Sequence, residues 1–163
     1  MKDRNKKILF IPINQVPNRQ KITHANPVFY YFPRKDDPYC VIITICGDKL
    51  PYPSYTGSLV ATLLEVKNIL NSVVLTPGSQ FICANIKDYF LCSPMELFKY
   101  IKIPICWITK EIQIQYNVYY LVEPDGYMYC KVRKCMYGLK QAAHISFGII
   151  VKLLAPHGYF PVQ

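Results

Sequence analysis

The stretch that decides the fold is Tyr119–Val132, which reads YYLVEPDGYMYCKV. Two strand-like runs, Tyr119–Val122 and Tyr127–Val132, flank the tripeptide Pro124-Asp125-Gly126. Aromatic and β-branched side chains favour strands, and a Pro-Asp-Gly sequence favours a tight turn. The stretch therefore predicts a β-hairpin and, with it, an antiparallel sheet.

Further elements are expected on both sides of this hairpin. Strand-like runs are Ile8–Ile13, Val28–Phe32, Cys40–Cys46, Gln80–Ile86 and Tyr100–Ile103. Helices are predicted at Ser58–Asn71 with Ser58 as N-cap, in a short segment after Thr109 as N-cap, and at about Lys140–Ala155. Because strands and helices mix without regular βαβ alternation, we expect an α+β domain with a mixed, mainly antiparallel sheet and two main helices.

The last helix is expected to be largely buried. Gln141, His144, Gly148 and Lys152 form a narrow polar stripe at helical spacing, and its other faces are apolar. We expect His144 to be solvated or hydrogen-bonded rather than a catalytic base. The sequence holds no Gly-x-Ser-x-Gly, His-Glu-x-x-His or phosphate-binding Gly-rich motif, which argues against a hydrolase triad and a P-loop enzyme.

The charge balance points to an anionic partner. The 163 residues include 19 Lys and Arg against 10 Asp and Glu, a formal net charge of +9. Yet only 18% of residues are charged, below the roughly 25% of ordinary soluble domains, and 52% are hydrophobic. A disordered polar tail is excluded by this composition. The basic excess suggests either an anionic ligand or a piece cut from a larger protein.

The cysteines and the apolar segments indicate a reducing, intracellular environment, either cytoplasmic or nuclear. The seven cysteines are odd in number and lack the two-residue gap of a zinc knuckle, so free and mostly buried thiols are expected, with a metal site or a disulfide framework as alternatives. The apolar run after the basic start is broken by Pro12, which argues against secretion. Phe147–Ala155 contains Lys152 and is shorter than the roughly 20 residues of a membrane span, so no membrane association is expected.

Two segments could carry chemistry. Phe81–Leu91 resembles a buried strand that runs into a turn with Asp88, and such a turn can project an acid into a site. Lys131–Ala143 clusters cationic and amide side chains around a glycine turn that opens a helix, a setting that can hold phosphate. The alternatives are a solvated turn for the first segment and a basic hairpin edge, kept soluble by lysines, for the second.

These segments resemble the reverse transcriptase domain of copia-like retrotransposons with long terminal repeats. Tyr137–Ala142 (YGLKQA) is similar to the Tyr-Gly-Leu-Lys-Gln-Ala/Ser signature, and Asn85–Leu91 (NIKDYFL) is similar to the Asp-Ile/Val-Lys-x-Ala/Phe-Phe-Leu palm motif. The resemblance covers roughly residues 22–160, as fingers and the first part of the palm. It implies a basic N-terminal segment with a leading strand at 1–21 and a partial reverse transcriptase domain at 22–163.

The resemblance implies RNA-directed DNA synthesis, in which two Mg²⁺ ions clamp the attacking oxygen and the nucleotide phosphate. It places Asn85 at a catalytic metal-ligand position and Asp88 near the triphosphate. It implies RNA or DNA template–primer as partner, together with other parts of a retrotransposon polyprotein. The implied nucleotide-binding residues are Tyr89, Phe90, Gly138 and Gln141, and the implied phosphate-contacting residues are Lys131, Arg133, Lys134 and Lys140.

The sequence departs from the family pattern at its metal ligands. Asn85 stands where the family has Asp, so the amide brings no negative charge, and no Tyr-x-Asp-Asp motif follows before Gln163. The fingers strand reads Cys40-Val41-Ile42 without a basic residue. We therefore expect a truncated, catalytically inactive fragment with no tightly bound Mg²⁺ and with poor solubility. The alternatives are a non-catalytic basic nucleic-acid-binding module, an active enzyme assembled from separate chains, and a structural protein without a ligand.

Overall fold

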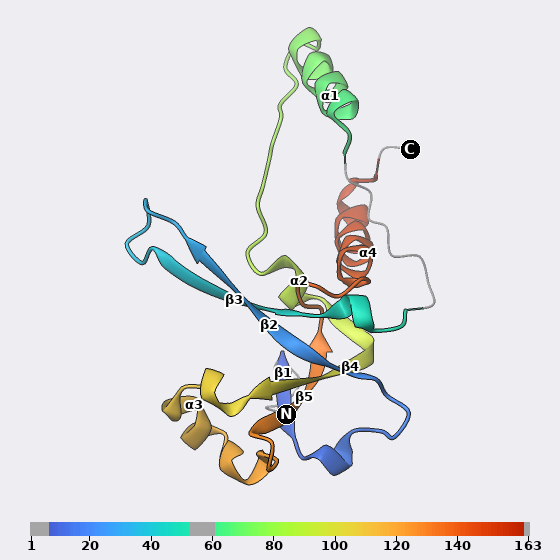
Figure 1. Cartoon of the computed structure of the whole chain (residues 1–163). Coiled ribbons are helices and arrows are strands. Elements are labelled where there is room, and N and C mark those ends of the chain that lie inside the picture. Colours follow the sequence, from blue (N-terminus) through green and yellow to red (C-terminus); the bar gives the residue numbers. More distant parts are fainter. Residues whose placement is uncertain (1–6, 53–60, 162–163) are drawn as a thin grey trace.

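Five strands form one sheet in the order β1-β5-β4-β2-β3 (Figure 1). The computed structural model describes residues 7–52 and 61–161. Only β2 and β4 pair in parallel; the other three pairings are antiparallel. This confirms the expected α+β class with a mixed, mainly antiparallel sheet. The strands are β1 (Ile8–Ile11), β2 (Ile22–Tyr31), β3 (Tyr39–Ile45), β4 (Pro94–Pro104) and β5 (Tyr127–Lys134).

The predicted hairpin forms its turn and its second strand but not its first. Gly126 has a φ of 78°, and its N–H donates to the Glu123 carbonyl at 2.9 Å. Before the turn, however, Val118–Leu121 forms a 3-10 helix, and only Val122 bridges to Met128. Val118 is fully buried within that 3-10 helix. Val118 packs in the core while Tyr119 and Tyr120 of the same segment are exposed, and β4 rather than this segment pairs with β5.

The prediction of a strand at Gln80–Ile86 is wrong. Residues 79–86 are extended, exposed and outside every strand, and the side chain of Ile82 is 82% exposed. A strand is stable only when a neighbour satisfies its backbone groups, and among the described residues none pairs with this segment. By contrast, the expected strand Tyr100–Ile103 is part of the longer strand β4, and the expected strand Val28–Phe32 lies in β2 except for Phe32.

The described part of the chain also forms four α-helices: α1 (Leu63–Leu75), α2 (Tyr89–Cys92), α3 (Lys110–Gln115) and α4 (Ala142–Leu154). Thr62 caps α1, because its hydroxyl accepts from the Glu65 N–H at 3.3 Å while the Glu65 carboxylate accepts from the Thr62 N–H. The predicted cap Ser58 lies outside the described residues. Thr109 is the N-cap position of α3, as expected, without a side-chain cap hydrogen bond. Figure 1 shows α1 standing away from the sheet, and none of its residues is buried.

The expectation that the last helix is largely buried is wrong. Only Ala142 and Ser146 of α4 are buried, and Leu153 near its end is exposed. The first turns of α4 pack at one end of the sheet, whereas the rest rises away from it (Figure 1). Among the described residues, no helix combines the length and apolar character needed to cross a bilayer.

The core lies on both faces of the sheet. Because strand side chains alternate, Cys130 and Val132 of β5 face the larger cluster, which includes Ile101 and Leu139. Tyr129 faces the opposite side with a smaller cluster of Ile11, Val16 and Tyr100. Strand β1, which precedes residue 21, pairs with β5 and so belongs to the same sheet.

The cysteines are free, as expected, but fewer are buried than expected. Cys130 and Cys135 are buried, while Cys83, Cys92 and Cys106 are exposed. Cys83 is exposed because the predicted strand Gln80–Ile86 does not form and residues 79–86 are unpaired.

Candidate functional site

The turn that joins β5 to α4 is held against the end of β3. Gly138 has a φ of 91°, a conformation that side chains with a β-carbon rarely adopt. The N–H of Ile45 donates to the Tyr137 carbonyl at 2.9 Å. A β-carbon on Gly138 would overlap the Ile45 carbonyl oxygen, and one on Gly47 would overlap the Gly138 carbonyl oxygen. Two glycines far apart in sequence therefore let these backbones touch.

The two predicted segments also meet at this turn. Phe90 of α2 meets Tyr137 edge-to-face, with ring centroids 5.0 Å apart. Tyr89 lies beside Phe90 at 5.5 Å, and burial raises the pKa of the Tyr89 phenol. Such edge-to-face pairs add to the energy of apolar burial. The predicted nucleotide-binding residues Tyr89, Phe90 and Gly138 therefore lie in one region.

Asn85 and Asp88 are less enclosed than the aromatic residues that follow them. Asn85 lies on the exposed segment 79–86 rather than at the end of a buried strand. Asp88 adopts a left-handed backbone with φ of 55° as the N-cap of α2. Its carboxylate pairs with the Lys7 ammonium at 3.0 Å, and both side chains are almost half exposed.

The side chains at this position do not fit a two-Mg²⁺ centre. Such a centre needs several anionic oxygen ligands, but Asn85 is neutral and Asp88 already pairs with Lys7. Within residues 7–52 and 61–161, no three or more His, Cys, Asp or Glu side chains form a group that could hold a metal ion. No chemical step through a metal is therefore assigned to these residues.

Gln141 is buried rather than open to a ligand. Its side chain is only 3% exposed, and its amide nitrogen lies 3.9 Å from the sulfur of Met95. The predicted polar stripe of α4 continues from it along one wall of a hollow of about 460 Å³. Met95 and Glu96 of β4 face the stripe across this hollow. Gln141 thus anchors α4 to β4.

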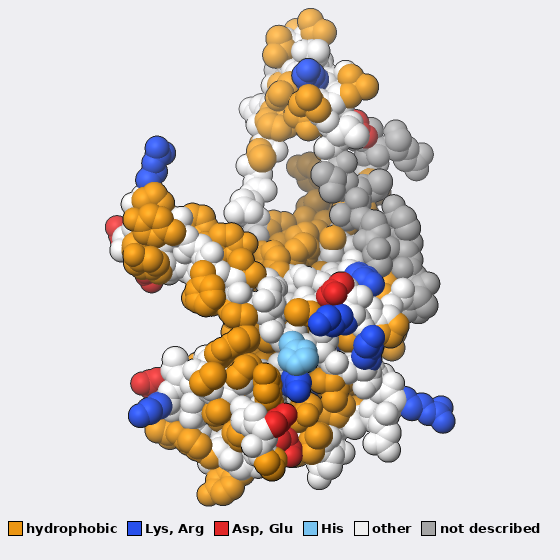
Figure 2. All heavy atoms as spheres, in the orientation of Figure 1, with side chains coloured by type: hydrophobic (Ala, Val, Ile, Leu, Met, Phe, Trp, Pro, Cys, Tyr) orange, Lys and Arg blue, Asp and Glu red, His pale blue; other side chains and the backbone are white. Residues whose placement is uncertain are grey.

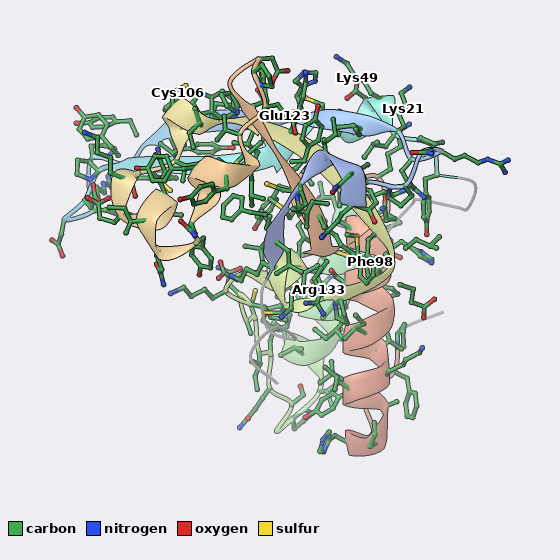
Figure 3. The ribbon with its side chains drawn as sticks, turned by 90° about the horizontal axis from the view of Figure 1, so that it is seen from below. Lys21, Lys49, Phe98, Cys106, Glu123 and Arg133 are labelled. Carbon is green, nitrogen blue, oxygen red and sulfur yellow. The ribbon has the colours of Figure 1, made fainter. Side chains whose placement is uncertain are left out.

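The predicted phosphate-contacting residues are divided between two faces of the sheet. Lys131 lies over the Phe98 ring at 4.3 Å, on the face of the smaller core cluster. Arg133 alternates onto the same face, and Figure 3 shows it near Phe98. Lys134 ends β5, where it pairs with Pro94. Lys140 instead lines a separate hollow together with Lys99 and Lys21.

That second hollow was missed by sequence reasoning. Its cations come from the segment before β2, from β4 and from the turn before α4. The parallel pairing of β2 with β4 brings the first two together, and nothing in the local sequence around either strand signals that pairing. Of its cations, only Lys140 belongs to the basic segment that the sequence singled out, and the charge excess of the whole chain gave no position for the others.

Comparisons of this chain with protein-family models, with curated proteins and with solved structures found no match.

Proposed function

We propose that this chain is a fragment of a retrotransposon reverse transcriptase that lacks polymerase activity and binds template–primer through backbone phosphates. The motifs of Asn85–Leu91 and Tyr137–Ala142 are the basis of the family proposal. The single structural observation in its favour is the contact of Phe90 with Tyr137 at 5.0 Å, which joins the two motifs in space. A polymerase needs both segments at one nucleotide site, so their proximity is required by the proposal.

The proposed loss of activity rests on the side chain at position 85. An amide oxygen can coordinate Mg²⁺ but cannot offset the charge of two divalent ions held close together. Asp88, the other polar group of that motif, has its carboxylate engaged by Lys7. Phosphate contacts, in contrast, need only cations on an accessible surface.

A second candidate function is a basic module that binds single-stranded nucleic acid without polymerase ancestry. It is favoured by the arrangement of Lys131 over the Phe98 ring, beside Arg133. Proteins that bind single strands combine cations for the backbone with aromatic rings on which bases stack. This candidate differs from the first in its preferred nucleic acid.

Two measurements test the proposal. Primer extension on an RNA template, with Mg²⁺ or Mn²⁺, is expected to give no incorporation above a no-protein control. Fluorescence anisotropy at about 50 mM salt is expected to show binding of an RNA–DNA template–primer that weakens steeply as salt rises. Incorporation by the wild-type chain would refute the loss of activity, and absence of template–primer binding would refute the proposed function.

The same titration separates the two candidates. A polymerase-derived surface is expected to prefer the template–primer duplex over a single strand of equal length. A stacking module is expected to prefer the single strand, and Phe98→Ala would then weaken binding by about 1–3 kcal/mol. Phe160→Ala, at an exposed ring beyond α4, is the matched control.

A further inference from the structure

Four cationic side chains from separate parts of the chain line one hollow of about 650 Å³. They are Arg19, Lys21, Lys99 and Lys140, and we call this site the basic hollow. Ile22 of β2 pairs with Tyr100 of β4, so Lys21 and Lys99 immediately precede the first residue pair of the parallel ladder. The fold thus sets two lysines side by side at the start of that pairing.

No acidic side chain among the described residues lines the basic hollow. The ion pairs of Lys7 with Asp88 and of Lys102 with Asp125 lie elsewhere. Asp48 belongs to the neighbouring 3-10 turn Gly47–Lys49, but its side chain is not part of the lining. Like charges gathered in this way repel one another, and a hollow walled by one sign of charge attracts counter-ions.

Further cations lie around the hollow. Figure 2 shows Lys and Arg side chains gathered on this face of the molecule, with acidic atoms between them. Figure 3 shows Lys49 and Lys21 projecting from the same side of the molecule. The Lys99 ammonium is held at 3.3 Å by the Pro51 carbonyl, which fixes one cation at the wall. A fixed cation loses less side-chain freedom when an anion binds.

Apart from Gln20, the other described residues of the wall are apolar or aromatic, and they indicate what accompanies the anion. Leu50, Pro51 and Tyr52 line the hollow beside the cations, and its volume is typical of sites for small organic ligands rather than bare ions. A ligand with a phosphate and an attached ring would match the cations with its phosphate and the apolar wall with its ring. The guanidinium of Arg19 adds a planar fork suited to phosphate oxygens.

We propose that the basic hollow binds the phosphate of a nucleotide, either free or within a polynucleotide. The phosphate lies among Arg19, Lys21, Lys99 and Lys140, and the sugar or base lies against Leu50 and Tyr52. Three of these four cations are outside the surface invoked for template–primer binding, with Lys140 common to both. The hollow therefore stands as a site whether or not the chain derives from a polymerase.

The test uses the full chain with three probes: adenosine monophosphate, adenosine as the phosphate-free comparison, and a fluorescein-labelled oligothymidylate. The hollow variant is Lys21→Gln/Lys99→Gln. Its matched control is Lys67→Gln/Lys110→Gln, which removes the same charge from exposed helical positions. Arg19→Gln, at an exposed position before β2, is a second hollow variant that leaves the sheet untouched.

Wild type is expected to bind the monophosphate or the oligonucleotide, but not adenosine. Both hollow variants are expected to weaken that binding on the order of tenfold, since hydrogen bonds to charged groups are lost, while the control variant binds like wild type. An effect on the monophosphate would identify a site for free nucleotides. An effect on the oligonucleotide alone would identify a backbone phosphate as the ligand.

Either of two outcomes would overturn the hollow as a phosphate site: equal losses in the hollow and control variants, or tight binding of adenosine. Template–primer binding that persists unchanged in both hollow variants would overturn its polynucleotide role and leave the proposed function standing. Monophosphate binding without any template–primer binding would overturn the proposed function and leave the hollow as a site for free nucleotides.

Discussion

Gly138 lies so close to Ile45 that a β-carbon on Gly138 would overlap the Ile45 carbonyl oxygen. In the same backbone contact, the Ile45 N–H donates to the Tyr137 carbonyl at 2.9 Å. The contact ties the end of β3 to the turn before α4, and the Phe90–Tyr137 pair lies next to it. The geometry of the candidate site therefore depends on a glycine at position 138, and Gly47 packs against the same turn.

We expect Gly138→Ala to lower the free energy of unfolding by about 2–5 kcal/mol. A left-handed backbone costs a residue with a β-carbon about 1–2 kcal/mol, and overpacking adds about 1–3 kcal/mol. Urea denaturation monitored by circular dichroism measures the change. The matched control is Gly126→Ala, because Gly126 has a φ of 78° but no atom within 4 Å of its added β-carbon. Equal losses in the two variants would show that the Ile45 contact contributes nothing.

We expect Mg²⁺ to leave the melting temperature unchanged relative to NaCl of equal ionic strength. A ligand stabilises a protein only when it binds the native state more tightly than the unfolded state, and Asn85 and Asp88 do not form an anionic pair free to bind a cation. Asn85→Asp alone should behave like wild type, since residue 85 lies on an exposed segment. A Mg²⁺-specific rise in Asn85→Asp that is missing from Asn85→Ala would contradict this account.

We expect alkylation to divide the cysteines by burial. Burial raises the pKa of Cys130 to about 12 and that of Cys135 to about 11, so at pH 8 neither has an appreciable reactive thiolate. Iodoacetamide should therefore modify the exposed Cys83, Cys92 and Cys106 first, as measured by peptide mass spectrometry. In concentrated urea all seven should react at similar rates. Early modification of Cys130 in the native chain would contradict the buried position of β5.

The same thiols predict a loss of stability at alkaline pH. In the unfolded chain they lose their protons near pH 9, whereas folded Cys135 and Cys130 retain them to about 11 and 12. The unfolded state then binds fewer protons than the folded state, so the free energy of unfolding falls as pH rises from about 9 towards 11. Cys130→Ser/Cys135→Ser should flatten that part of the curve of stability against pH. An equally steep fall in this variant would assign the loss to other groups.

We expect the chain to self-associate through the β2–β3 ribbon. Phe29 pairs with Val41 and Tyr31 with Tyr39 across this ribbon, and Phe29 and Tyr39 are each 75% exposed. Figure 2 shows the apolar side chains along the projecting ribbon, and β3 is an edge strand of the sheet. An exposed apolar edge favours pairing with a second chain.

Sedimentation velocity over a range of protein concentrations measures this association. Phe29→Lys/Val41→Lys should shift the distribution towards monomer, because two charges on the edge oppose pairing. The control Ile114→Lys/Leu153→Lys places the same charges at exposed apolar positions elsewhere. An equal shift in the control would mean that net charge, not the ribbon, governs association.

The sequence by itself determined the local turns and the class of fold. Pro124-Asp125-Gly126 forms the predicted turn, and the expected strand after it is β5, which lies between β1 and β4 in the sheet. These features follow from backbone preferences that act within a few residues. The same local preferences predicted a strand at Gln80–Ile86, and this was wrong because a strand also requires a neighbour.

Only the tertiary structure decided which segments meet. The contact between Gly47 and Gly138 and the parallel pairing that sets Lys21 beside Lys99 join residues far apart along the chain. Composition revealed the basic excess but not its position. Tertiary pairing placed Lys131 and Lys140 on different faces of the sheet, although both belong to one basic run of sequence. The reason is physical: side-chain direction alternates along a strand and changes again at a turn, so neighbours in sequence need not be neighbours in space.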